Sequence, residues 1–316
     1  MKPIVYITRK LPAEAIKGLE GSYEVRMWQD EEQPVPREVL LEEARYASAL
    51  WTMLSDQIDS EVIETAENLK IITNLAVGYN NIDLDAARKH KIAVTNTPEV
   101  LTETTADLAF ALMLATARRL VQAEKTVRSG EWQSWTPMGM TGQDVFGATL
   151  GIIGMGRIGE AVCRRAKGFD MNVIYHNRTR RSLEDVDYAE FDDLLAKSDF
   201  VMIFTPLTEE TRGMIGEREL ALMKNTACLI NAARGGIVDE EALYEALKSG
   251  SIWAAGLDVF EQEPLPLDSK LLELENLTVL PHIGSAGIRT RFEMMKLNSE
   301  AISACLAGTP VKNRVC

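Results

Sequence analysis

The chain has 316 residues and a mass of 35.1 kDa, which is more than one hydrophobic core usually serves, so its length predicts two domains. Hydrophobic residues make up 46% and charged residues 26% of the sequence, as in an average soluble globular chain, and 21 glycines and 11 prolines give no sign of collagen or of a disordered tail. Because 47 acidic residues face 34 basic ones, the formal net charge is −13, and we expect neither nucleic acid nor an anionic membrane surface as a partner.

The spacing of the cysteines is typical of free thiols in a reducing compartment, and the N-terminus does not resemble a signal peptide. Cys163, Cys228, Cys305 and Cys316 are too widely spaced for a CxxC zinc or redox motif, and we expect no metal site. The first apolar run is short and ends at Arg9, so it is too short for the core of a signal peptide. No run approaches the roughly 18 apolar residues of a membrane span. We therefore expect a cytoplasmic protein without a membrane partner.

The first third of the chain alternates short β-branched runs with segments of helical period. Strands are expected at 4–8, 23–28, 48–54 and 70–77, and helices at 13–20, 36–46, 60–68 and 84–91. This alternation predicts a parallel sheet flanked by helices. A longer helix is expected over 97–120, with Pro98 near its start and Arg118 and Arg119 at its end. It is apolar on most faces, which favours a buried position.

A second α/β series follows a loop at 129–148. Six strands are expected, at 149–154, 171–176, 199–205, 226–233, 252–260 and 277–281. This is the number of strands in a doubly wound nucleotide-binding sheet. The tail from 285 onwards reads as an amphipathic helix that ends before Gly308 and Pro310.

A GxGxxG pattern at Gly154, Gly156 and Gly159 directly follows the first strand of this second series. The pattern alone is weak evidence, because three glycines can also form an ordinary tight turn. Its position between a strand and a helix is what gives it weight. Backbone N–H groups at the positive end of that helix would meet a pyrophosphate, so the turn predicts a dinucleotide site.

The residues after the next strand bear on the choice of cofactor. An NAD site usually has an acidic residue there, about 20 positions beyond the glycines. Here the strand is followed by Asn177, Arg178, Thr179, Arg180 and Arg181. Guanidinium groups suit the 2′-phosphate of NADP, so NADP(H) is favoured and NAD(H) is the second possibility. The alternative is a solvated basic loop without a role in binding.

Three ionisable residues follow the expected strands of the second series, namely Arg234, Glu263 and His282. Ligands of open α/β sheets bind beyond the carboxyl ends of the strands, where these residues can converge. An arginine can hold a 2-oxo acid, a histidine can supply a proton, and a carboxylate can support the charged histidine. Each residue alone has a structural explanation, so the combination carries the prediction.

Several segments resemble the D-isomer-specific 2-hydroxyacid dehydrogenases, in the glyoxylate and hydroxypyruvate reductase branch. They are GIIGMGRIGEAVCRRAKGF, NAARGGIVDEEALYEAL, AAGLDVFEQEPLP and LPHIGSA, together with the segment from NLAVGYNNID to LMLATARR. The resemblance covers nearly the whole chain. It implies an α/β fold of two doubly wound parallel-sheet domains, in which a Rossmann domain (100–283) is inserted into a flavodoxin-like substrate domain (1–99 and 284–316).

The resemblance also implies the roles of individual residues. Arg234, Glu263 and His282 correspond to the catalytic residues, Val77 and Gly78 offer N–H groups to the substrate carboxylate, and Asp258 lies near the nicotinamide. The expected cofactor site comprises Gly154, Met155, Gly156, Arg157, Ile158, Gly159, Asn177, Arg178, Thr179, Arg181, Thr205, Pro206, Ala232, Ala233, Asp258 and Gly284. The expected substrate site comprises Leu54, Ala76, Val77, Gly78, Arg234 and His282.

These residues predict the NADPH-dependent reduction of glyoxylate or hydroxypyruvate, with His282 as the proton donor. One alternative is a larger sugar acid such as 2-ketogluconate. The other is a nucleotide-sensing corepressor that has this fold without turnover, since fold alone does not decide function. We expect a homodimer, in which the resemblance implies that Trp132 or Trp135 reaches the neighbouring subunit's site. The alternative is that both tryptophans pack their own loop.

Overall fold

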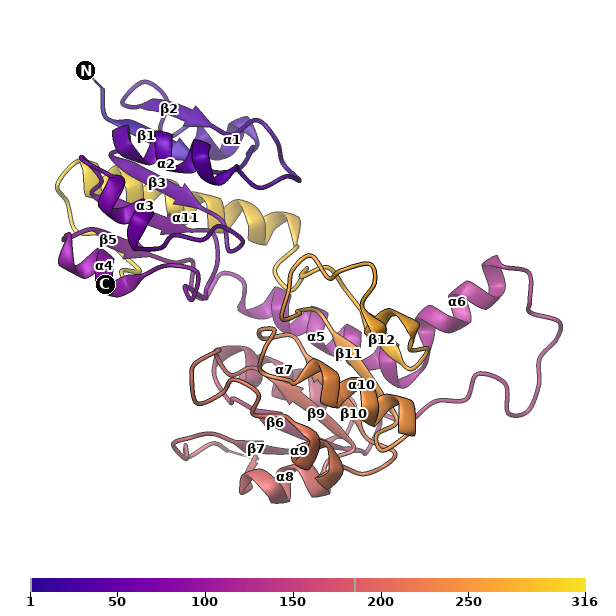
Figure 1. Ribbon diagram of the computed structural model, residues 1–316. Helices are drawn as coiled ribbons and strands as arrows, with labels where there is room; N and C mark the ends of the chain where they lie inside the picture. Colours follow the sequence, from indigo (N-terminus) through magenta and orange to yellow (C-terminus); the bar gives the residue numbers. More distant parts are fainter. Residues whose placement is uncertain (1, 185) are drawn as a thin grey trace. The chain divides into compact units, whose positions relative to one another are not determined.

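The computed structural model describes residues 2–184 and 186–316, which form two units (Figure 1). The first unit comprises Met1–Leu101 and Ala286–Cys316, and the second comprises Thr102–Ser285. The second unit is therefore inserted in the sequence of the first. Among the described residues, no helix combines the length and apolar composition needed to cross a membrane.

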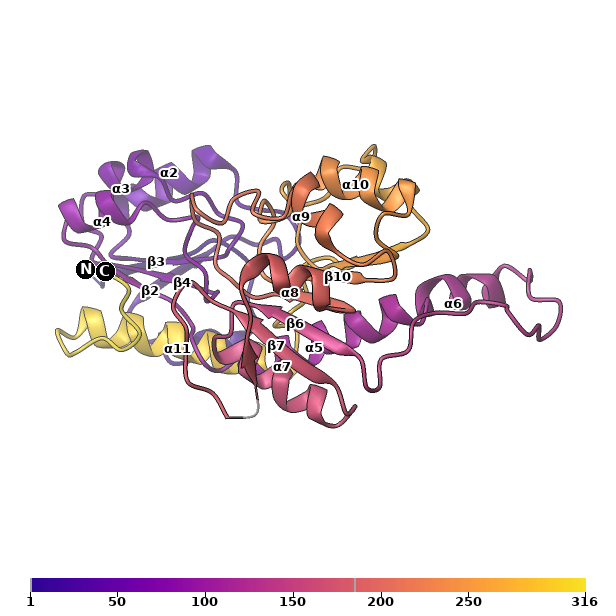
Figure 2. The ribbon, with the colours of Figure 1, turned by 90° about the horizontal axis from the view of Figure 1, so that it is seen from below.

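The first unit is built on a parallel sheet with the strand order β2-β1-β3-β4-β5. Its strands are β1 (Ile4–Ile7), β2 (Glu24–Met27), β3 (Ala49–Thr52), β4 (Ile71–Asn74) and β5 (Ala93–Thr95). Its helices are α1 (Ala13–Ile16), α2 (Arg37–Tyr46), α3 (Ser60–Thr65), α4 (Leu84–Lys89) and α11 (Ile288–Leu306). Figure 2 shows α2, α3 and α4 on one face of the sheet and α11 on the other. Since both faces are covered, β3 and β4 are buried throughout, as expected of a central parallel strand.

Several expected elements of this unit are shorter in the structure, such as the helix expected at 13–20, which ends at Ile16, and one strand was missed. The strand expected at 70–77 ends at Asn74, because the chain then turns at Leu75–Gly78. The missed strand is β5, which has three residues and pairs with β4.

The second unit contains a parallel sheet with the strand order β12-β11-β10-β9-β6-β7-β8. The strands are β6 (Thr149–Ile153), β7 (Asn172–His176), β8 (Asp187–Tyr188), β9 (Phe200–Ile203), β10 (Cys228–Asn231), β11 (Ala254–Leu257) and β12 (Leu277–Val279). The order turns back between β6 and β9, which is the point where open α/β sheets bind their ligands. Both units are α/β with parallel sheets, and the second has the Rossmann arrangement, so the expected fold class is confirmed.

Helices cover both faces of this second sheet (Figure 2). They are α5 (Thr102–Ala117), α7 (Arg157–Lys167), α8 (Phe191–Lys197), α9 (Glu217–Leu222) and α10 (Glu240–Ser249), with a short 3₁₀ turn η1 (Lys270–Glu273). A further helix, α6 (Leu120–Arg128), has no buried residue and extends away from the sheet (Figure 1). The single helix expected over 97–120 is wrong in its extent. Arg119 has a φ of 53°, which interrupts the helix and separates α5 from α6.

Candidate active site

The glycine turn links β6 to α7. Gly154 has a φ of +96°, and a Cβ atom there would lie 2.6 Å from the Thr205 backbone nitrogen. A Cβ on Gly159 would lie 2.8 Å from the Gly154 oxygen, so both positions require glycine for backbone packing. Gly156 caps the start of α7, and no described atom lies within 4 Å of a Cβ built on it. The turn therefore leaves room at the helix start, where a pyrophosphate would fit.

The segment after β7 is fastened to this turn. Asn177 Oδ1 accepts a hydrogen bond from the Met155 N–H at 2.6 Å. Arg181 donates to the Met155 carbonyl at 2.6 Å and pairs with Glu160 at 2.5 Å. The buried Tyr175 hydroxyl accepts from the Arg181 N–H at 3.0 Å and donates to the Arg181 carbonyl. These contacts fix both ends of the segment 177–181 beside the glycines.

The other arginines of this segment point to different partners. Arg178 is 87% exposed and lies 3.3 Å from Glu210. The Arg180 guanidinium lies 5.2 Å from the centre of the Tyr188 ring. Arg178 and Arg180 are thus exposed side chains with one partner each, whereas Arg181 is part of the turn's framework.

His282 and Glu263 form a hydrogen-bonded pair. His282 Nδ1 lies 2.7 Å from Glu263 Oε2, and Glu263 Oε1 accepts from the Phe260 N–H at 3.0 Å. Burial tends to raise the pKa of Glu263, but the His282 hydrogen bond and charge, the Phe260 N–H and the Arg234 charge outweigh it and hold this pKa below its usual value. Because a carboxylate only accepts, His282 carries a proton on Nδ1, and its Nε2 remains for chemistry.

The backbone that follows His282 is held in place by the Asp258 carboxylate. Its two carboxylate oxygens accept hydrogen bonds from the N–H groups of Ile283 and Gly284, each at 2.8 Å. Burial raises the pKa of Asp258, partly offset by these N–H groups and by the His282 charge. His282 itself has a φ of 53°. Asp258 thereby fixes a turn whose first residue is in a conformation that non-glycine residues seldom adopt.

Arg234 follows β10, and its backbone is positioned by two contacts. The side-chain amide of Asn231, which is buried at the end of β10, donates to the Arg234 carbonyl at 2.9 Å and accepts from the Ala233 N–H at 3.1 Å. A Cβ on Gly235 would lie only 1.7 Å from the Phe260 oxygen, so the loops that follow β10 and β11 touch at this glycine. Burial lowers the pKa of Arg234, and the charge of Glu263 partly offsets this.

The remaining expected cofactor residues also belong to this unit. Arg157 and Ile158 begin α7, and Thr205 and Pro206 follow β9. Ala232 and Ala233 follow β10 and are half-buried. Together with the glycine turn they follow β6, β9 and β10, at the same edge of the sheet. The buried Asn231 was missed by the sequence analysis, although a polar residue that ends the apolar run CLIN was a usable signal.

Residues 76–78 form the expected carboxylate-binding loop of the first unit, and this loop is held in place by its carbonyl groups. The Ala76 carbonyl accepts from the Thr97 N–H at 2.9 Å, and the Val77 carbonyl accepts from the Asn96 amide at 2.8 Å. In a trans peptide the N–H points away from the carbonyl of the same plane. The N–H groups of Val77 and Gly78 are therefore directed to the opposite side. Within 2–184 and 186–316 no acceptor lies in hydrogen-bonding reach of either N–H.

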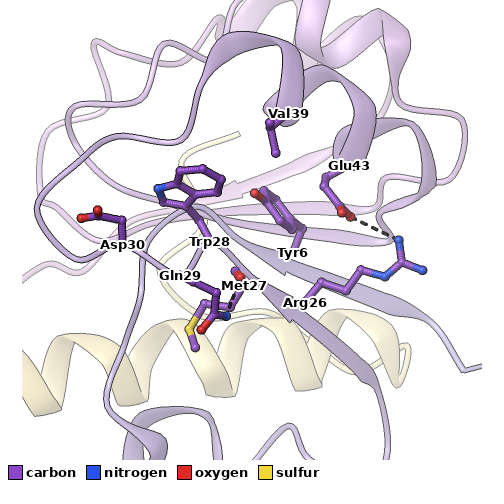
Figure 3. A pocket seen from close by; sticks show the side chains of 8 residues that line it. All are labelled: Tyr6, Arg26, Met27, Trp28, Gln29, Asp30, Val39 and Glu43. Atoms are coloured by element: carbon purple, nitrogen blue, oxygen red, sulfur yellow. Dashed lines mark hydrogen bonds and ion pairs between the residues drawn. The ribbon is translucent and has the colours of Figure 1, made fainter.

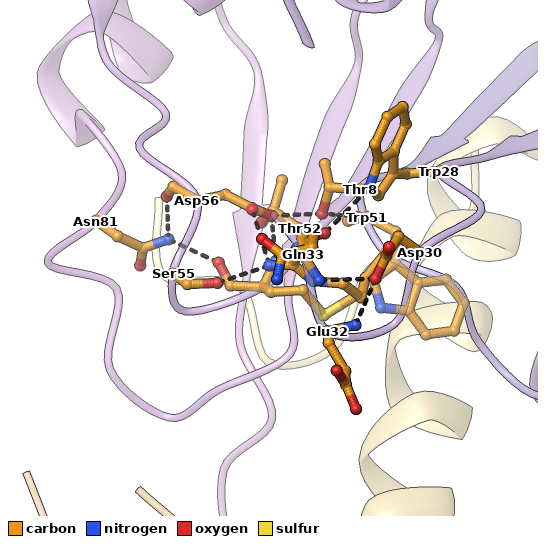
Figure 4. A network of polar contacts seen from close by, with 12 residues as sticks. Thr8, Trp28, Asp30, Glu32, Gln33, Trp51, Thr52, Ser55, Asp56 and Asn81 are labelled. Atoms are coloured by element: carbon orange, nitrogen blue, oxygen red, sulfur yellow. Dashed lines mark hydrogen bonds and ion pairs between the residues drawn. The ribbon is translucent and has the colours of Figure 1, made fainter. Parts of the chain in front are cut away.

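Polar side chains also fasten the turn that carries Leu54. The buried Asp56 accepts hydrogen bonds from the Thr8 hydroxyl and from the Met53 N–H, the latter at 2.7 Å (Figure 4). Arg9 lies 3.7 Å from the same carboxylate and donates to Ser55 at 2.9 Å. Burial raises the pKa of Asp56, and these three groups partly offset it. Leu54 itself is half-buried.

A separate pocket of about 450 Å³ lies in the first unit, between α2 and the strands β1 and β2 (Figure 3). It contains none of the expected site residues and is lined by Tyr6, Arg26, Met27, Trp28, Gln29, Asp30, Val39 and Glu43. Burial, reinforced by the charges of Glu43 and Asp56, raises the pKa of Tyr6 to about 12. The Tyr6 hydroxyl therefore remains protonated at neutral pH.

Comparison with known proteins connects this geometry to a family. Residues 110–284 match the model of the D-isomer specific 2-hydroxyacid dehydrogenase, NAD binding domain. A glyoxylate reductase from Pyrococcus horikoshii is 52% identical, over 98% of this chain and 94% of the relative. A protein of known structure from Thermus thermophilus superimposes with a TM-score of 0.94 at 44% identity, over 99% of this chain and 100% of that one.

A second structure is informative about the cofactor. It is an NADPH-dependent glyoxylate/hydroxypyruvate reductase from Sinorhizobium meliloti in complex with NADP and malonate. It is 31% identical, has a TM-score of 0.87, and the match covers 100% of this chain and 97% of that one.

Proposed function

This chain belongs to the D-isomer-specific 2-hydroxyacid dehydrogenases, a family of oxidoreductases, and we propose that it reduces glyoxylate and hydroxypyruvate with NADPH. The observation that carries the proposal is the His282–Glu263 pair, at 2.7 Å, in the unit that also holds the glycine turn. A paired histidine and carboxylate are suited to deliver a proton to a carbonyl oxygen.

The residues present fit a nicotinamide dinucleotide. The open space at Gly156 receives the pyrophosphate at the start of α7, and the segment 177–181 lies beside it. When bound, NADPH supplies a hydride to C2 of the oxo acid. The side chains and N–H groups of the protein then have three tasks, which are to bind the carboxylate, to polarise the carbonyl and to protonate its oxygen.

We assign these tasks to named groups. His282 donates the proton from Nε2 to the carbonyl oxygen, and Glu263 stabilises the charged imidazole through Nδ1. Arg234 pairs with the substrate carboxylate and polarises the carbonyl. The N–H groups of Val77 and Gly78 bind the carboxylate, and Leu54 and Ala76 complete the substrate contacts. Asp258 holds the turn that carries His282.

The preference for NADPH rests on Arg178 and its neighbours. The segment has no acidic residue at the position where NAD sites carry one, and Arg178 is exposed next to the glycine turn. The relative from S. meliloti is described as NADPH-dependent, which supports the same choice. Arg178 and Thr179 bind the 2′-phosphate in this proposal, and Arg181 holds the turn in shape.

Steady-state rates with NADPH and NADH on glyoxylate, hydroxypyruvate and 2-ketogluconate test the proposal. We expect the highest kcat/KM with NADPH and one of the two smaller acids. A higher value with 2-ketogluconate would replace the substrate, and a higher value with NADH would replace the cofactor. For Arg178→Ser we expect KM for NADPH to rise by about tenfold while KM for NADH stays unchanged, since one charge-assisted phosphate contact is lost.

A further inference from the structure

Asn81 contacts two separate turns of the first unit. Its Nδ2 donates to the carbonyl of Met53 at 3.1 Å and to the carbonyl of Asp56 at 2.9 Å. Its Oδ1 accepts from the Asn74 amide at 3.0 Å. Figure 4 shows Asn81 beside Asp56, at the end of the network that contains Thr8 and Ser55. One carboxamide therefore joins the turn 53–56 to the end of β4.

The connection continues to the carboxylate-binding loop. Asn74 is fully buried and uses its second N–H to donate to the Gly78 carbonyl at 2.9 Å. Its Oδ1 accepts from the Thr52 hydroxyl at 3.1 Å. All four amide N–H bonds of Asn74 and Asn81 thus have acceptors, which fixes the orientation of both amides.

The backbone of residue 81 is held independently of its side chain. The Asn81 carbonyl accepts from the Ile58 N–H at 2.9 Å, and Asp83 N–H donates to the Ile58 carbonyl at 2.8 Å. Asp83 also caps α4 through the Ala86 N–H at 2.9 Å. A substitution of the Asn81 side chain should therefore release the two turns from each other and leave the chain path at residue 81 in place.

We propose that Asn81 is a positioning residue for the oxo-acid substrate, because its carboxamide fixes the Leu54 turn and, through Asn74, the Gly78 end of the carboxylate-binding loop. The inference rests on the proposed function, since it assumes that these two turns bind the acid. Asn81 lies in the first unit, whereas the glycine turn and the segment 177–181 lie in the second. Its loss should affect the acid and not the nucleotide.

Asn81→Ala tests this with Asn276→Ala as the matched control. Asn276 is also a half-buried asparagine whose amide bridges two carbonyls, those of Leu247 at 3.1 Å and Trp253 at 3.0 Å, but it lies in the second unit. KM for glyoxylate, Ki for oxamate as an unreactive carboxylate and Kd for NADPH are measured on the full chain, together with the melting temperature. For Asn81→Ala we expect KM and Ki to rise by about tenfold and Kd to change by less than about twofold. Asn276→Ala should lower the melting temperature and leave KM and Ki at their wild-type values.

The outcomes separate the inference from the proposed function. If the wild-type protein reduces no 2-oxo acid, the proposed function fails. If it reduces glyoxylate and Asn81→Ala keeps the wild-type KM and Ki while its melting temperature falls, Asn81 is only structural and the inference is overturned. Should Asn81→Ala not fold, Asn81→Ser keeps one donor, and the same criteria apply to it.

Discussion

Glu263 keeps its negative charge to lower pH than an ordinary glutamate does, because His282, Phe260 N–H and Arg234 outweigh the effect of burial. The folded-state pKa is below that of the unfolded chain, which is about 4.3. Ionised Glu263 therefore contributes stability above that value, and the contribution is lost as the pH falls through the folded-state pKa. For Glu263→Gln we expect a constant difference in urea midpoint from the wild type near neutral pH, and a difference that shrinks below about pH 4. The exposed Glu14→Gln is the control for net charge, and a difference that grows in acid would contradict this assignment.

Arg234 acts on both binding and chemistry in the proposed function. Its charge would hold the substrate carboxylate in the ground state and polarise the carbonyl in the transition state. We expect Arg234→Ala to raise KM and lower kcat together, with kcat/KM reduced by about 10² to 10⁴. Arg234→Lys should recover part of KM, since a lysine keeps the charge and loses the forked geometry. Steady-state kinetics measure both constants, and an unchanged KM in Arg234→Ala would refute the carboxylate contact.

Ionisable residues at strand ends could be predicted from the sequence as functional, whereas the asparagine amides that support them could not. Parallel strands end at one edge of a sheet, and this rule alone brought Arg234, Glu263 and His282 into consideration. Asn74 and Asn231 each end an apolar strand, but a single amide has no characteristic chemistry that marks it as functional. Its role depends on which carbonyls lie nearby, and those are set by tertiary contacts such as Asn81 with Met53.

At the scale of elements, we expect alanine substitutions at two glycines of the same turn to have different effects, one on stability and one on nucleotide binding. Gly154 has a φ of +96°, and a Cβ atom there would clash with the Thr205 backbone. A Cβ atom on Gly156 would have no neighbour within 4 Å. We expect Gly154→Ala to lower the free energy of unfolding by more than about 1 kcal/mol. Gly156→Ala should retain its stability and raise Kd for NADPH, because its methyl group occupies the space proposed for the pyrophosphate. Urea unfolding and fluorescence titration measure the two effects, and a stable Gly156→Ala with wild-type Kd would contradict the proposed phosphate position.

The elements that sequence analysis missed are short or depend on tertiary contacts. Both β5 and β8 occur at edges of their sheets, and β8 consists of two residues. So short a strand has no period of its own and forms because β7 offers it a partner. The break between α5 and α6 depends on the left-handed backbone conformation of Arg119. An arginine in the sequence does not predict this conformation, because non-glycine residues seldom adopt it. The fully buried strands β9 and β10, by contrast, were identified from the apolar runs that contain them.

At the scale of the whole molecule, the alternation of strands and helices predicted both parallel sheets, because parallel strands need crossover helices. The domain limits at 99/100 and 283/284 stay a prediction about which parts fold together. The segment 131–142, which follows α6, has no helical or strand periodicity in its sequence, so no element could be predicted there. It carries Trp132, Trp135 and Met138, which are 63%, 78% and 77% exposed in the single chain. α6 adds the exposed Leu120 and Val127.

Three large apolar side chains are thus exposed within seven residues of one segment, and a cluster of exposed apolar side chains favours an interface. We therefore expect a homodimer in which the segment 131–142 is covered by a second copy. Sedimentation equilibrium should give twice the chain mass of 35.1 kDa for the wild type and the single mass for the double variant Trp135→Asp, Met138→Asp. Leu267→Asp is the matched control, because Leu267 is 96% exposed but lies outside this segment, and it should remain dimeric. A wild-type monomer, or a double variant that still dimerises, would show that this segment is not the interface. If the dimer dissociates and kcat/KM for glyoxylate falls with it, the partner chain also supports turnover, whereas unchanged kinetics would mean that each chain works alone.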